Sequence, residues 1–290
     1  MPPQNEVLQR YEGAVSKGDF ASAVHVAEEM KEITESPHRD SLVRLARAHA
    51  LAGRGQAALM ALWEAVDAGF WDAVGLREDP AFTWLRGEEA FKAIVRASWA
   101  RGYLAMLERD ERESFQRTAE VMRTLAFRPG ERVVDLGAGS GYFTIPIARA
   151  VGPGGIVWAV DVFQEMLDFI ERRIAVERLD NIRLFQTSRE ELNLPDGNLD
   201  TILMSDMLHY VPDRVPLLRK LKPFLRPGGR MAVLEFTPKP MAERPWGPAP
   251  DQQVSRETIE SEMRQAGMRF SAAYDFLPEQ HFTIHVRDPE

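Results

Sequence analysis

The residues best suited to chemistry lie in the segment VVDLGAGSGYFT, residues 133–144. The short apolar run Arg132 to Leu136 contains an acid and suits a buried parallel strand better than a helix. Gly137, Gly139 and Gly141 follow at alternate positions, and apolar residues then recur at helical spacing. A strand, a glycine turn and a helix in this order let a ligand lie against bare backbone, because no Cβ occupies the ligand's space. We therefore predict a ligand-binding turn here.

The spacing of the glycines selects among ligands. A dinucleotide fold needs G-x-G-x-x-G, whereas this segment reads G-x-G-x-G and has Tyr142 in the place of the last glycine. A phosphate-cradling G-x-x-x-x-G-K-[ST] is absent from the sequence. The segment resembles motif I of the class I S-adenosylmethionine-dependent methyltransferases, and the resemblance continues over roughly Arg128 to Arg287.

An acid follows the second predicted strand at the expected place. The apolar run Ile156 to Val160 ends at Asp161, which stands twenty residues (161 − 141) after Gly141, where a ribose-binding carboxylate is expected. A carboxylate can accept hydrogen bonds from both ribose hydroxyls. The alternative is that Asp161 caps the next helix. Phe163 and Met166 could pack on adenine or could equally belong to the core.

The loop after the third strand (182–186) departs from the family pattern. Where the family often carries an Asp that takes the adenine amino group, this chain has Ser188, and the Arg189 backbone or Glu190 could share that role. The resemblance implies the following cofactor-binding residues: Asp135, Gly137, Ala138, Gly139, Gly141, Tyr142, Asp161, Val162, Phe163, Met166, Ser188, Arg189 and Ser205.

The candidate catalytic residues follow the fourth and fifth predicted strands. Strand 199–204 is followed by SDMLHY, and open α/β sheets bind ligands at the carboxyl ends of strands where the chain order reverses. Asp206 is predicted to lie near the methionine moiety or the acceptor. His209 has a side chain whose pKa suits removal of an acceptor proton, although it could merely bond a loop. Glu235, at the end of strand 231–236, could be a wall residue or a base.

Two further segments bear on the site. Residues 237–251 contain five prolines and Trp246 and are predicted to be a substrate-facing lid. His281 and His285 are four residues apart, which on a strand separates them by roughly 13 Å, too far for one ion. We therefore predict no metal site.

The first hundred residues read as successive helices, at 6–17, 20–34, 39–52 and 56–68. Gly18 and Ala23 recur as Gly53 and Ala58, an offset of 35 (53 − 18), close to the tetratricopeptide period. The region resembles degenerate tetratricopeptide helices. It could recruit a protein partner or pair two chains, or it could only cover apolar surface.

The predicted organisation has three parts. Residues 1–100 form the helical domain, 101–127 a connecting or lid helix, and 128–290 the methyltransferase domain. Arg101 to Leu125 is predicted to be one long helix whose charged run, 108–113, is a solvated face, with Phe115 and Gln116 as candidate lid residues. The predicted fold class is α/β: a doubly wound, mostly parallel seven-stranded Rossmann-like sheet with the last strand antiparallel, preceded by an all-α domain.

Composition limits the partners. The chain has 290 residues, 36 basic and 44 acidic, with a net charge of −8, which does not favour nucleic acid or anionic membranes. The signature [DNS]-P-P-[YFW] of adenine-amino methyltransferases is absent, which argues against base methylation. There is no cysteine, which excludes disulfides and thiolate chemistry. With no signal peptide or membrane span apparent, we expect a cytoplasmic protein.

Taken together, the residues and the resemblance predict methyl transfer from S-adenosylmethionine by in-line displacement. The protein would hold acceptor and methyl in line, exclude water and take a proton. A small-molecule acceptor is the first hypothesis. A protein acceptor recruited by the helices is the second, and a non-catalytic cofactor-binding scaffold or a nicotinamide oxidoreductase is the alternative from another class.

Overall fold

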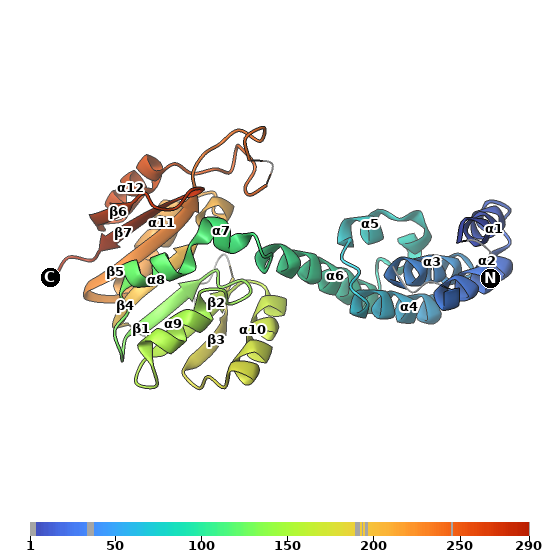
Figure 1. Ribbon diagram of the computed structural model, residues 1–290, viewed down its shortest axis with the longest axis horizontal. Coiled ribbons are helices and arrows are strands. Elements are labelled where there is room, and N and C mark those ends of the chain that lie inside the picture. The colour runs from blue at the N-terminus through green and yellow to red at the C-terminus, as the bar shows by residue number, and fades with distance from the viewer. Residues whose placement is uncertain are drawn as a thin grey trace. The chain divides into compact units, whose positions relative to one another are not determined.

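The computed structural model describes residues 4–33, 38–188, 192, 194, 197–244 and 246–289. The chain divides into two compact units, Met1–Met106 and Leu107–Glu290, and Figure 1 shows the first as helices only and the second as a sheet with helices on both faces.

The first unit consists of consecutive helices. Its elements are α1 (Gln4–Ser16), α2 (Phe20–Ile33), α3 (His38–Leu51), α4 (Gly55–Asp67), α5 (Ala73–Glu78), the 3₁₀ helix η1 (Pro80–Leu85) and most of α6 (Glu89–Leu107). The four predicted helices of this region are therefore confirmed as helices.

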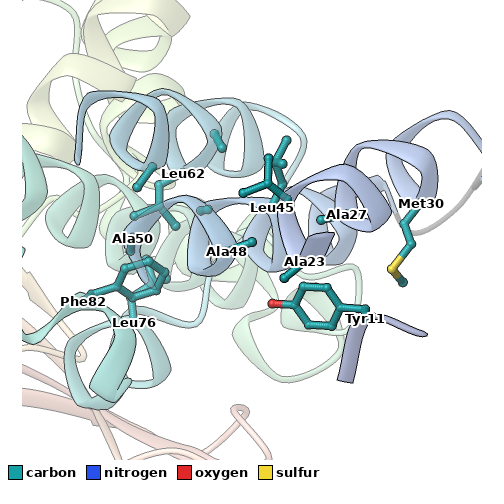
Figure 2. Packing of buried hydrophobic residues seen from close by; sticks show 14 of the residues in the cluster. Tyr11, Ala23, Ala27, Met30, Leu45, Ala48, Ala50, Leu62, Leu76 and Phe82 are labelled. Atoms are coloured by element: carbon teal, nitrogen blue, oxygen red, sulfur yellow. The ribbon is translucent and has the colours of Figure 1, made fainter. Parts of the chain in front are cut away.

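Small residues let these helices pack closely. Ala23, Ala27, Ala46 and Ala58 have no exposed surface, and α1 to α4 each pack against the next helix. Figure 2 shows this interior, in which alanines alternate with larger side chains such as Leu62. The packing suits paired helices, and the tetratricopeptide assignment itself stays a prediction.

The second unit is built on a seven-stranded sheet in the order β3-β2-β1-β4-β5-β7-β6. The strands are β1 (Arg132–Leu136), β2 (Ile156–Asp161), β3 (Ile182–Gln186), β4 (Leu199–Ser205), β5 (Leu225–Phe236), β6 (Arg269–Tyr274) and β7 (Gln280–Val286). β1 to β5 pair in parallel, and β7 pairs antiparallel to β5 and to β6. The predicted fold class is confirmed.

Alternate residues of the strands point to two separate cores. On one face, Val133 packs with α8 (Thr118–Leu125), α9 (Thr144–Val151) and α10 (Gln164–Glu177). On the other, Val134 packs with α11 (Arg214–Leu221) and α12 (Arg256–Gln265). The sheet is thus covered on both faces, which explains why its central strands read as continuous apolar runs. The chain order reverses between β1 and β4, so their carboxyl ends flank the binding crevice.

The connection into the sheet differs from the prediction. One helix over Arg101 to Leu125 is wrong: α6 ends at Leu107, and α7 (Arg112–Gln116) and α8 are separate short helices. Arg117, with a left-handed φ of 42°, breaks the chain between α7 and α8. The charged run does not form one helix face either: residues 108–111 precede α7, and Arg112 is buried, whereas Glu108, Asp110, Glu111 and Glu113 are exposed.

Ser255 caps α12 by accepting a hydrogen bond from the Thr258 N–H. As predicted, His281 and His285 lie on a strand, β7. Among the described residues, no helix is both long enough and apolar enough to cross a membrane.

The turn between α9 and β2 provides a stability test. An added Cβ at Gly155 would lie 2.7 Å from the Glu131 carbonyl oxygen and 2.6 Å from the Val151 Cβ, whereas at neighbouring Gly154 the nearest atom would be 3.9 Å away. Gly155→Ala should therefore lower the free energy of unfolding by about 1–3 kcal/mol, while Gly154→Ala should change it by less than about 0.5 kcal/mol. Urea unfolding of both variants measures this, and equal effects would contradict the packing described.

Candidate functional site

The glycine loop after β1 has a backbone that other residues rarely adopt. Gly137, Gly139 and Gly141 have φ values of 73°, 55° and 76°. An added Cβ at these positions would lie 2.8 to 3.0 Å from side-chain atoms of Met207, Leu107 and Ile170 respectively. The glycines are therefore required by backbone conformation and by packing against the protein, in addition to any ligand.

Two buried groups anchor the loop on either side. Asp135 accepts a hydrogen bond from the Thr144 hydroxyl at 2.6 Å, which ties β1 to α9. The N–H groups of Gly137 and Ala138 both donate to the Val160 carbonyl, which ties the loop to β2. Burial raises the pKa of Asp135 to about 6.

Asp161 is held in place by backbone donors. Its carboxylate oxygens accept hydrogen bonds from the Gly139 N–H at 2.8 Å and from the Phe163 N–H at 3.0 Å. Burial raises its pKa, and the backbone hydrogen bonds oppose that rise. A carboxylate has about four acceptor positions, so Asp161 keeps acceptor capacity for ribose hydroxyls. The N-cap of α10 is Phe163 and no side chain caps this helix, so the alternative that Asp161 caps it is wrong.

The remaining predicted cofactor residues divide by exposure. Phe163 is 39% exposed at the start of α10, whereas Met166 is fully buried, so only Phe163 has surface to offer an adenine. Ser188 is exposed just after β3, and Val162 is half-buried. Arg189 lies outside the described residues. Ser205 ends β4 with a buried hydroxyl that has no hydrogen-bond partner within the described chain.

Asp206 follows β4 in an unusual setting. It has a left-handed φ of 53°, and both its carboxylate oxygens accept from the Gln280 side-chain amide, at 2.7 and 2.8 Å. Burial, followed by the nearby Glu235 carboxylate, raises the pKa of Asp206 to about 7. Asp206 is thus close to half ionised at neutral pH.

His209 and Glu235 form a buried pair. His209 Nδ1 lies 2.7 Å from Glu235 Oε1, and the backbone N–H groups of His209 and Phe236 also donate to this carboxylate. Glu235 has no exposed surface and His209 is 7% exposed. The structure therefore brings together the three predicted catalytic side chains, Asp206, His209 and Glu235.

The segment before β1 closes one side of the glycine loop. Ser140 donates a hydrogen bond to Glu108, and the Arg112 guanidinium stacks 3.8 Å from the centre of the Tyr142 ring. The Tyr142 hydroxyl donates to Glu113 at 2.8 Å. These contacts tie the charged run to the glycine loop through the buried Arg112 and the exposed Glu108 and Glu113.

An aromatic cluster adjoins the His209–Glu235 pair. The Phe115 ring lies 4.8 Å from that of Trp246 and 5.9 Å from that of Phe236, and His209 lies 6.4 Å from Phe236. The predicted lid thus meets α7 at the end of β5 through Trp246. His281, on β7, is buried outside this cluster, and its Nε2 lies 3.0 Å from the Val254 carbonyl oxygen.

Sequence reasoning missed the partners of Asp206. The sequence pattern assigned no role to Gln280 and marked Arg112 only as part of the charged run 108–113. Gln116 and Gln280 are 164 residues apart, and no local pattern marks such a pair. Among the described residues, no group of three or more His, Cys, Asp or Glu side chains is placed to hold a metal ion.

Comparisons with known proteins agree with this geometry. Residues 111–244 match the model of the ubiE/COQ5 methyltransferase family. A crystal structure of an S-adenosylmethionine-dependent methyltransferase from Aquifex aeolicus superposes with a TM-score of 0.59 at 22% identity, covering 64% of this chain and 97% of that one. The Leu107–Glu290 unit has the class I methyltransferase fold.

Two curated relatives match the methyltransferase-fold unit in sequence. The ubiquinone/menaquinone biosynthesis C-methyltransferase UbiE of Vibrio parahaemolyticus is 38% identical over 117 residues, which are 40% of this chain and 45% of that protein. The demethylmenaquinone methyltransferase of Geobacillus stearothermophilus is 31% identical over 116 residues, 40% of this chain and 50% of that protein. The match thus spans about half the length of these relatives.

The residues present fit the cofactor that these comparisons support, S-adenosylmethionine. The positive-φ glycine loop and the backbone-fixed Asp161 suit the adenosyl end. The half-buried Asp206 carboxyl and the Ser205 hydroxyl, which has no partner within the described chain, stand at the end of β4, the strand next to β1. Nothing in this donor set conflicts with a cationic nucleoside ligand.

Removing the charge of Asp161 should weaken cofactor binding. Asp161→Asn leaves one oxygen in place of two and keeps the side-chain size, so we expect the Kd for S-adenosylhomocysteine to rise at least about tenfold, or about 1.4 kcal/mol. Asp168→Asn on α10, whose carboxylate accepts only from Gln164, is the matched control and should leave the Kd unchanged. Isothermal titration calorimetry measures both, and equal Kd values would remove Asp161 from the site.

Cofactor affinity should also depend on pH through Asp206. Because its pKa is raised to about 7, the carboxyl is largely neutral below that pH and ionised above it. An ionised carboxylate attracts the sulfonium cation, so affinity for S-adenosylmethionine should rise from about pH 6 to about pH 8. S-adenosylhomocysteine has a neutral sulfur and should show a weaker rise. Calorimetry of both ligands across this range tests the point, and identical pH profiles would contradict it.

Proposed function

We propose that this chain transfers a methyl group from S-adenosylmethionine to a small-molecule acceptor by in-line displacement. The observation that supports it is the gathering of a glycine loop, the backbone-fixed Asp161 and the buried His209–Glu235 pair at the carboxyl ends of β1, β2, β4 and β5. Ligands of open α/β sheets bind at this edge.

The cofactor, when bound, supplies an electrophilic methyl group on a sulfonium. The chain's contribution is then positioning, charge and proton transfer. The glycine loop and Asp161 hold the nucleoside, and the half-buried Asp206, when ionised, places negative charge at the end of β4. The α7 segment, stacked on Tyr142, keeps water from one side of the loop.

The pairing with Glu235 prepares His209 as a base. A carboxylate only accepts, so Nδ1 of His209 carries the proton in this hydrogen bond and Nε2 is the nitrogen able to receive one. Glu235 is itself fixed by two backbone N–H groups, so the imidazole is held in one orientation. The arrangement resembles the base–orienter pairs that activate hydroxyl groups in other enzymes.

The acceptor class follows from the relatives and the aromatic cluster. The two relatives are named for methylation in quinone biosynthesis and of demethylmenaquinone. We propose a reduced quinone for this chain. Loss of a phenolic proton, which His209 would take, makes the neighbouring ring carbon nucleophilic. That carbon takes the methyl group as S-adenosylhomocysteine leaves, and loss of the carbon's own proton, with return of a proton to the phenolate oxygen, restores the aromatic quinol. Phe236 lies beside His209, and Phe115 and Trp246 pack on Phe236, so the wall next to the proposed base is aromatic.

Fold alone does not decide the chemistry. The [4+2]-cyclase SpnF superposes with a TM-score of 0.50 at 17% identity, covering 63% of this chain and 85% of that one, so the proposal depends on the site residues. That the helices of the first unit recruit a protein or pair two chains, and that the protein is cytoplasmic, stay predictions.

The His209–Glu235 pair provides the test of function. His209→Gln and Glu235→Gln should each lower kcat by about 10²- to 10⁴-fold, because general base catalysis is lost, while calorimetric affinity for S-adenosylhomocysteine stays unchanged. His25→Gln, at an exposed position of α2, is the control and should keep full activity. Transfer of tritiated methyl from the donor to a reduced 2-prenyl-1,4-naphthoquinone measures kcat.

The outcomes separate the parts of the proposal. Labelled methyl on another compound of a cell extract, with none on the quinol, would refute the acceptor and keep methyl transfer. A folded protein that binds S-adenosylhomocysteine yet labels neither the quinol nor any extract component would be a scaffold, and the proposed function would be wrong.

A further inference from the structure

Four side chains form one hydrogen-bond chain that ends at the half-buried Asp206. Arg112 Nε donates to Gln116 Oε1 at 3.4 Å, Gln116 Nε2 donates to Gln280 Oε1 at 3.2 Å, and Gln280 Nε2 donates to both Asp206 oxygens. Gln116 has no exposed surface, Gln280 is 2% exposed and Arg112 is 9% exposed. The chain links α7, β7 and the end of β4.

The direction of this hydrogen-bond chain is fixed at its start. A guanidinium has only donors, so the Gln116 side chain must turn its oxygen towards Arg112 and its amide nitrogen towards Gln280. Gln280 must then turn its own oxygen to Gln116 and its nitrogen to Asp206. All hydrogen bonds in the chain therefore run from donor to acceptor in one direction, from Arg112 to Asp206. Arg112 orients the donors at Asp206 without bonding to it directly. The group that receives these donors is best satisfied as an ionised acceptor.

The charges around Asp206 make this direction matter. Glu235, from β5, repels the ionised form, while Arg112 from α7 and His209 from η2 (Leu208–Tyr210) favour it, and Gln280 from β7 donates to it. Burial also disfavours the charge. Gln280 is therefore the one direct hydrogen-bond donor to the carboxylate among its described side-chain neighbours, and it acts against both burial and Glu235.

The start of the chain sits on a short helix that contacts the glycine loop. Arg112 and Gln116 are both on the five-residue α7, and Arg112 also stacks on Tyr142. The Arg112 guanidinium also donates a hydrogen bond to the Leu107 carbonyl at 2.9 Å, which fixes its position. Displacement of α7 would withdraw Arg112 and Gln116 together, leaving Gln280 without the partner that orients it.

We propose that Arg112, Gln116 and Gln280 are positioning residues that keep the Asp206 carboxylate ionised and aimed into the crevice, so that Asp206 acts only when α7 is seated on the glycine loop. The proposal deepens the proposed function, on which the role of Asp206 in methyl transfer rests. The hydrogen-bond chain acts through Asp206, and none of its three other members needs to touch the cofactor or the acceptor.

The ionisation of Asp206 is the readout. Protein labelled with ¹³C at aspartate carboxyl carbons gives a titration curve for each residue, and the Asp206 signal is assigned by its absence in Asp206→Asn. Gln280→Met keeps the side-chain length and removes the donor, so the Asp206 midpoint should rise by about one to two pH units. Gln116→Met, which does not touch Asp206, should raise it by a smaller amount in the same direction.

A matched control and a second readout complete the experiment. Gln265→Met, at an exposed position of α12, should leave the midpoint unchanged. In the methyl transfer assay of Gln280→Met, the pH at which kcat/KM falls on the acid side should rise by as many pH units as the Asp206 midpoint. The value of kcat/KM at high pH should be largely kept. A merely structural role would lower the plateau and leave the limb in place, which would overturn the proposal.

The NMR result decides the proposal even without activity. If Gln280→Met does not fold, Gln116→Met carries the test, because it leaves the bond to Asp206 intact. A Gln280→Met midpoint within about 0.3 pH units of the unmodified protein would overturn the proposal, since a lost charged hydrogen bond is worth more than that. If only Gln116→Met folds, a midpoint that does not rise at all would overturn it. Shifted midpoints in a protein that transfers no methyl group would uphold the hydrogen-bond chain and refute the proposed function instead.

Discussion

Three carboxyl groups at one edge of the sheet constrain the rest of this structure. Asp135 and Glu235, near the ends of β1 and β5, are almost inaccessible to water, and Asp206, directly after β4, is half-buried. A buried carboxylate is costly unless hydrogen bonds or opposite charges stabilise it. Each carboxyl group has different hydrogen-bond partners: the Thr144 hydroxyl for Asp135, the Gln280 amide for Asp206, and His209 with two backbone N–H groups for Glu235.

These requirements explain the elements that surround the sheet edge. Two contacts of Arg112 hold the short α7 against the glycine loop. Its guanidinium stacks on Tyr142, and it donates to Gln116, the first bond of the hydrogen-bond chain that ends at Asp206. The antiparallel β7 begins at the residue that binds Asp206. A cationic ligand complements an edge built in this way, since it offsets negative charge that the protein has removed from water. The need to stabilise these carboxyl groups therefore explains both the contacts around the sheet edge and why a cationic ligand suits it.

The sheet and the cofactor side could be predicted because their signals are local. The glycine spacing at 137–141, the acid at the end of β2 and the apolar runs are short-range patterns that survive without tertiary information. The network around Asp206 could not be predicted, because it joins α7 to β7 through residues far apart in sequence. The charged run 108–113 misled for a related reason: helical periodicity does not reveal that Arg117 adopts a left-handed conformation and that Arg112 turns inward.

The central claim is that the sheet edge between β1 and β4 binds an adenosyl sulfonium ligand. A crystal structure of the chain grown with S-adenosylhomocysteine tests it most directly. We predict density for the adenosine on the glycine loop, with the ribose hydroxyls within hydrogen-bonding distance of the Asp161 carboxylate and the sulfur facing the end of β4. Density for the ligand at another place, or an empty crevice at saturating ligand, would contradict the account.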